Sequence, residues 1–76
     1  MTSYEVHLHI VPNNSFGVAV FPTMTEAILY LNELVTDLLA LPQVQDAEWI
    51  DDDHVHLLDH HGRILGHATL VMETLH

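Results

Sequence analysis

The sequence predicts a small α+β domain in which one amphipathic helix packs on one face of an antiparallel sheet, with the element order β-β-α-β-β-β. Three observations support this prediction. Apolar and polar side chains alternate over residues 4–11, as in a half-buried strand, and an apolar stripe of helical period runs through residues 24–40. Short segments typical of strands follow, each bounded by turn residues. A chain of 76 residues is expected to form a single domain, residues 1–76.

The first two strands are expected to form a hairpin. Residues 4–11 carry apolar side chains on one side, residues 12–15 are typical turn formers, and residues 16–21 are apolar throughout. We expect a register that keeps large apolar side chains together. This register pairs Ile10 with Val18 and Leu8 with Val20. On the reverse face it places His9 opposite Ala19 and His7 opposite Phe21.

The third element is a helix that begins near Met24 and ends near Ala40. Thr23 and Glu26 have the spacing of a capping box, in which the threonine side chain caps the first turn. Pro42 disfavours continuation of the helix. Leu29 lies among polar residues and is expected to be exposed. The apolar stripe consists of Met24, Ala27, Ile28, Leu31, Leu34, Val35, Leu38 and Leu39.

The rest of the chain predicts three strands, over residues 47–50, 54–58 and 63–72. The last two form a hairpin that allows two registers. A two-residue loop pairs Leu57 with Ile64 and His54 with His67. A type I turn that ends on Gly62, with a bulge, pairs Leu57 with Leu65 and His54 with Ala68. The hydrophobic pattern favours the first register, which we expect, whereas the turn residues favour the second.

Composition excludes several classes of protein. One basic residue against eleven acidic residues gives a formal net charge of −10, so direct binding to nucleic acid or to an anionic membrane is not expected. A hydrophobic content of 49% is too high for a disordered acidic tail. The absence of cysteine excludes disulfides and thiolate metal sites. The sequence shows neither a secretory signal nor a membrane-spanning run, so we expect a cytoplasmic protein.

The eight histidines are the most unusual feature. His54 and His56 share one face of a predicted strand, and in the preferred register His67 lies beside them. Three imidazoles from neighbouring strands are the ligand set of catalytic zinc sites, so this trio is the candidate metal site. His7 and His9, which share a face of the first strand, are possible additional ligands. The alternative is that all these histidines are surface residues on a solvent-exposed face.

The two His-x-His segments resemble short motifs of known families. They resemble the paired motifs of two-histidine phosphoesterases, which carry Ser or Thr where this chain has His9 and His56. The segment 54–58 resembles part of the histidine-triad nucleotide hydrolase motif, with Leu58 in place of its third histidine. Both families also use basic or polar phosphate contacts that this sequence lacks. We therefore transfer no catalytic residue from either family.

Six of the eleven acidic residues fall within residues 46–59. Such a cluster could bind calcium or imitate a nucleic-acid backbone, but the calcium-loop pattern of alternating oxygens, a glycine and a closing glutamate is not met. The alternative is a solvated turn, which aspartates favour. The cluster comprises Asp46, Glu48, Asp51, Asp52, Asp53 and Asp59.

The favoured interpretation is a small acidic interaction or regulatory module that is non-enzymatic, needs no cofactor and forms a homodimer. Its basis is the large apolar area expected on the second face of the sheet, since such patches mark contact sites. The residues expected there are Val11, Gly17, Ala19, Phe21, Leu58, Leu65 and Val71. One alternative is a histidine-based divalent-metal-binding protein or metal-dependent hydrolase that uses zinc. The other is an acidic inhibitor that mimics nucleic acid and binds a basic protein.

Overall fold

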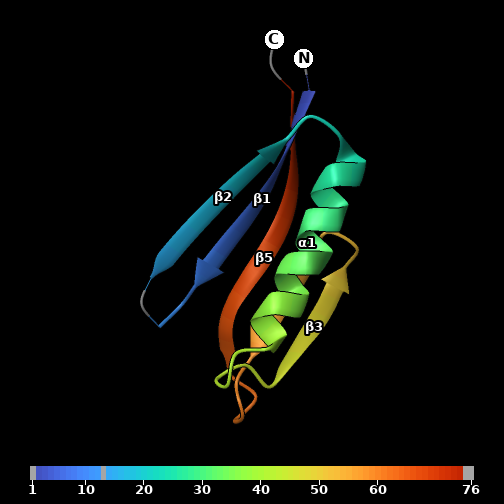
Figure 1. Cartoon of the computed structure of the whole chain (residues 1–76). Coiled ribbons are helices and arrows are strands. Elements are labelled where there is room, and N and C mark those ends of the chain that lie inside the picture. Colours follow the sequence, from blue (N-terminus) through green and yellow to red (C-terminus); the bar gives the residue numbers. More distant parts are fainter. Residues whose placement is uncertain (1, 13, 75–76) are drawn as a thin grey trace.

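A computed structural model, which describes residues 2–12 and 14–74, shows a five-stranded antiparallel sheet with one helix on one face (Figure 1). The predicted fold class and element order are confirmed. The strands lie in the order β2-β1-β5-β4-β3, so the last strand of the chain inserts between the first and the fourth. The elements are β1 (Thr2–Ile10), β2 (Ser15–Phe21), α1 (Met24–Leu39), β3 (Asp46–Asp51), β4 (His54–Leu58) and β5 (Ile64–Thr74).

The helix begins and ends where the sequence predicts. The Thr23 side chain accepts a hydrogen bond from the backbone N–H of Glu26 at 3.3 Å, which satisfies one of the free donors of the first turn. The helix ends at Leu39, three residues before Pro42. Leu29 is 60% exposed, as predicted. In the described part of the chain, no helix has both the length and the apolar character needed to cross a membrane.

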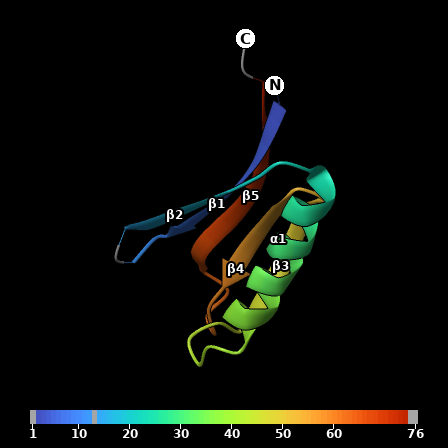
Figure 2. The same cartoon turned by 45° about the horizontal axis from the view of Figure 1, so that its top comes forward.

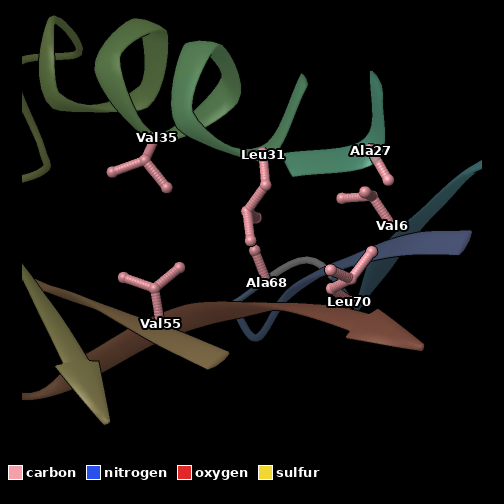
Figure 3. Packing of buried hydrophobic residues seen from close by; sticks show 7 residues of the cluster. All are labelled: Val6, Ala27, Leu31, Val35, Val55, Ala68 and Leu70. Carbon is pink, nitrogen blue, oxygen red and sulfur yellow. The ribbon is translucent and has the colours of Figure 1, made fainter. Parts of the chain in front are cut away.

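The hydrophobic core lies between α1 and one face of the sheet (Figure 3). The predicted apolar stripe is wider than the buried one, since Met24, Ile28 and Leu39 are each at least 40% exposed. Met24 and Ile28 border a hollow beside the exposed aspartates 51–53. The helix covers only part of the sheet, and the β1–β2 hairpin extends past it (Figures 1 and 2). The side chains that meet in the core are Val6, Ala27, Leu31, Val35, Val55, Ala68 and Leu70.

The predicted register of the first hairpin is wrong. Asn14 adopts a left-handed conformation, with a φ of 51°, and its N–H donates to the carbonyl of Val11 at 3.2 Å. This turn closes early, so that Ser15 already pairs with Ile10. The observed partners are Val6 with Ala19, Leu8 with Gly17, His9 with Phe16 and His7 with Val18.

This shift exchanges the two faces of β2. Gly17, Ala19 and Phe21 belong to the face that α1 covers, where the Phe21 ring contacts Tyr30 at 5.0 Å, and not to the second face as predicted. Their neighbours Phe16, Val18 and Val20 belong to the opposite face, which we call the open face because no helix covers it.

The last hairpin follows neither predicted register throughout. Gly62, with a φ of 77°, ends the turn as expected, and next to it Leu58 pairs with Ile64. A bulge then adds one residue on β5, so that His56 lies opposite His67 and His54 lies opposite Thr69. The pairing of His54 with His67 was therefore wrong. The prediction that His54, His56 and His67 lie on one face of the sheet is confirmed. The observed register differs from the predicted one by two residues, and a shift of two residues leaves every side chain on the same face.

The same bulge moves Leu65 away from the second face predicted for it. Leu65 lines a groove under the end of the helix together with Leu38 and Leu57. Gly66 follows at a point where β5 approaches β1 closely. A Cβ atom on Gly66 would collide with the carbonyl oxygen of His9 and lie 3.1 Å from the Ile10 side chain.

We therefore expect Gly66→Ala to lower the free energy of unfolding by about 1–3 kcal/mol, the usual cost of overpacking. Gly17→Ala is the matched control, because a Cβ atom there meets nothing within 4 Å; its effect should stay within about 0.5 kcal/mol. Urea unfolding followed by circular dichroism measures both. Equal stability of the two variants would contradict the close approach of β5 to β1.

Candidate functional site: a histidine cluster on the open face

The three central strands bring five of the eight histidines together on the open face. His67 on β5 lies opposite His9 on β1 and opposite His56 on β4. Two residues further along β5, Thr69 lies opposite His7 on β1 and opposite His54 on β4. We call these five histidines the histidine grid: His7, His9, His54, His56 and His67. All candidate site residues predicted from the sequence are members of it.

A chain of hydrogen bonds fixes the centre of the grid. The Asn14 side-chain oxygen can only accept, so the Nε2–H of His9, 3.1 Å away, donates to it. The Nδ1 of a neutral His9 then carries a lone pair and accepts from the Nε2–H of His67 at 3.2 Å. This arrangement leaves the lone pair of His67 on Nδ1. Asn14 was not predicted as a site residue, because its contact with His9 depends on the tight first turn.

The two rings on β1 differ in their surroundings. The His9 ring stacks on Phe16 with 4.3 Å between centroids and 2° between planes, so its orientation is held on one side by packing. Phe16 was also not predicted here, because the expected register placed it on the other face. His7 is more exposed and forms a 2.9 Å contact from Nε2 to the carboxylate of Glu5, two residues away on the same strand.

The rings of His54 and His56 on β4 lie at right angles, with centroids 5.0 Å apart. The Nε2 atom of His54 is buried and has no hydrogen-bond partner among the described residues. Buried polar atoms are almost always paired, so this nitrogen is free to take a partner that the described residues do not supply in this arrangement.

His67, at the centre of the grid, favours the neutral imidazole. Burial lowers the pKa of His67, and the neighbouring His9, His54 and His56 lower it further. No carboxylate contributes to this shift.

Asp59 has a structural role. Its carboxylate accepts the backbone N–H groups of His61 and Arg63 at 2.8 and 2.9 Å, and the bond from Arg63 is the main reason that its pKa is lowered. Two members of the acid cluster occupy register positions beside the grid: Glu48 lies opposite His56, and Asp51 lies opposite His54. The consecutive Asp51, Asp52 and Asp53 are exposed around the turn between β3 and β4. The acid cluster is thus divided between a turn-forming aspartate and solvated side chains.

The side chains as arranged do not form a ready metal site: within residues 2–12 and 14–74, no three histidine or acidic side chains converge on one point. An ion shared by His54, His56 and His67, as predicted from the sequence, would therefore require these side chains to move from the observed arrangement. His60, outside the grid, donates from Nε2 to the carbonyl of Pro42 at 2.9 Å and ties the last turn to the end of the helix.

Comparison of the chain with known protein families, with characterised proteins and with solved structures finds no match.

The lowered pKa of His67 predicts how stability depends on pH. As the pH falls through about 6.5, the unfolded chain takes up a proton at this residue before the folded chain does, so the free energy of unfolding decreases. At higher pH, both states are neutral at this residue and the effect vanishes. His67→Gln should therefore lose part of the decrease between pH 7.5 and pH 5.5. Urea unfolding in the presence of EDTA measures it.

His61→Gln, which removes a histidine from the exposed turn outside the grid, is the control and should keep the pH dependence of the parent protein. If both substitutions reduce the pH dependence of the free energy of unfolding equally, this pH dependence does not originate in the histidine grid.

Proposed function

We propose that this protein is a small interaction module that forms a homodimer through the open face of its sheet. One observation carries the proposal: Phe16, Val18 and Val20, at successive same-face positions of β2, are 71%, 58% and 60% exposed. Val71 adjoins them across Glu5 of β1. A row of large apolar side chains on an uncovered sheet face is typical of a contact surface.

The charge distribution favours a second copy of the chain at this face. The net charge of −10 makes two copies repel each other in most orientations. The centre of the open face is occupied by imidazoles and Thr69, and carboxylates lie around them: Glu5 and Glu73 on β1 and β5, and Glu48 and Asp51 opposite His56 and His54. Contact through the apolar row and the rings costs far less desolvation than burying unpaired carboxylates, and Glu5, which lies within the apolar row, keeps a partner in His7 at 2.9 Å.

The size of the open face suits a small interface. Four gaps of about 4.8 Å separate the five strands, so the face is roughly 19 Å wide between its outer strands, and the seven residues of β2 extend about 24 Å. The flat area, roughly 460 Å², is smaller than the roughly 800 Å² that each partner buries in a standard interface, so we expect a dimer of moderate affinity. A shallow hollow of about 280 Å³ beside His9, Phe16 and Val18 can receive a side chain of the second copy.

The proposal is tested by two substitutions that add the same charge at equally exposed positions. We expect the parent protein to have about twice the chain mass of 8.6 kDa, and Val18→Glu to raise the dimer dissociation constant at least about tenfold. Leu29→Glu places the same charge on the outer side of α1 and should leave the dimer intact. Sedimentation equilibrium over a range of concentrations measures all three proteins.

A parent protein that stays at 8.6 kDa at tens of micromolar would refute the dimer. Dissociation by Leu29→Glu and not by Val18→Glu would instead place the interface on the helix.

A further inference from the structure

We infer that His54, His56 and His67 bind one divalent transition-metal ion, best matched by zinc, and that His9 positions His67 for this role. The inference goes beyond the proposed dimer and does not depend on it, because all four histidines lie on one chain.

The spacing of the three rings is close to what a shared ion requires. In a tetrahedral zinc site with Zn–N bonds of 2.0–2.1 Å, two imidazole rings have their centres about 5 Å apart. The observed distances between ring centroids are 5.0 Å for His54–His56, 6.0 Å for His54–His67 and 6.3 Å for His56–His67. The three separations therefore exceed the required one by about 1.3 Å at most. The paired strands fix the three Cα positions, and the proposed site requires the rings to rotate about their side-chain bonds so that their nitrogens face one point.

Two nitrogens in the trio are available as ligands. His54 Nε2 is buried without a hydrogen-bond partner among the described residues, and an ion between the rings would supply what it lacks. His67 keeps the lone pair on Nδ1 because its Nε2–H donates to His9. Histidines that bind metals commonly donate their second N–H to a neighbouring acceptor, which fixes the tautomer and the ring orientation. His9, held by Asn14 and stacked on Phe16, is such an acceptor.

The chemistry of the ligands restricts the ion. Imidazoles bind zinc, copper, nickel and iron, whereas magnesium and calcium require oxygen ligands. A set of three histidines leaves a fourth position for water. Glu48 is the carboxylate that the strand register places beside His56, and it can bind the ion or orient that water.

The test is a titration of the chelator-treated full chain with zinc at pH 7.5, in which isothermal titration calorimetry measures the binding. We expect one ion per chain with a dissociation constant on the order of 1 μM, and no binding of calcium. His54→Gln and His67→Gln should each weaken zinc binding at least about 100-fold, and His9→Gln by about 10–100-fold. His61→Gln, in the exposed turn outside the grid, is the matched control and should bind zinc as the parent does.

Two further measurements separate a lost ligand from a lost fold or a lost dimer. Cobalt bound to the parent protein should give the visible absorption of a tetrahedral site, which reports geometry directly. Zinc should raise the melting temperature of the parent and of Val18→Glu, but not of the folded His54→Gln/His67→Gln double variant. The inference is overturned if the parent binds zinc no more tightly than about 1 mM, or if His61→Gln weakens binding as much as His67→Gln does. Binding by Val18→Glu in the absence of a dimer would show that the two proposals are independent.

Discussion

One physical constraint governs the rest of this structure: a single helix has to cover a five-stranded sheet. The 16 residues of α1 form a cylinder about 24 Å long and about 10 Å wide, whereas the sheet is roughly 19 Å across between its outer strands and its longest strand, β5, has 11 residues and extends about 37 Å. The helix therefore covers less than half of one face and none of the other. The core is correspondingly small, centred on Leu31 against Val6 and Val55, and large apolar side chains of β2 remain uncovered. Everything proposed for function concerns the surface that this helix cannot reach.

The sequence predicts the elements well because their signals are local. The alternation of β1, the capping residues around Thr23 and the glycine of the last turn each act within a few residues. The registers depend on smaller details. The left-handed conformation of Asn14 shortens the first loop. One extra residue on β5 allows the last hairpin to have both the turn that ends on Gly62 and the hydrophobic pattern of its two strands. A period of two determines which residues share a face, but it does not determine which residues lie opposite each other.

The candidate site was predictable only to the same extent. Strand alternation predicts that His54 and His56 share a face of one strand, and that His7 and His9 share a face of another strand. That the two pairs meet through His67 requires β5 to lie between β1 and β4. This strand order reflects long-range packing and has no local signature. The contacts of His9 with Asn14 and Phe16 depend in turn on the corrected register of the first hairpin.

The composition of the grid explains how one face can serve both proposals. In a chain with eleven acidic residues and one basic residue, the centre of the open face holds imidazoles, the one type of side chain that can be polar, uncharged and metal-binding near neutral pH. Neutral rings can be covered by a second copy at a modest cost of desolvation, and the same neutral rings retain the lone pairs that an ion needs. The two uses involve different edges of the face, since the apolar row lies on β2 and the buried His54 lies on β4. They meet at His9, which stacks on Phe16 on one side and accepts from His67 on the other. His9 is therefore the residue at which the surface proposed for a second copy adjoins the proposed trio, and each of its two contacts lies within one chain, so the trio is complete without the second copy.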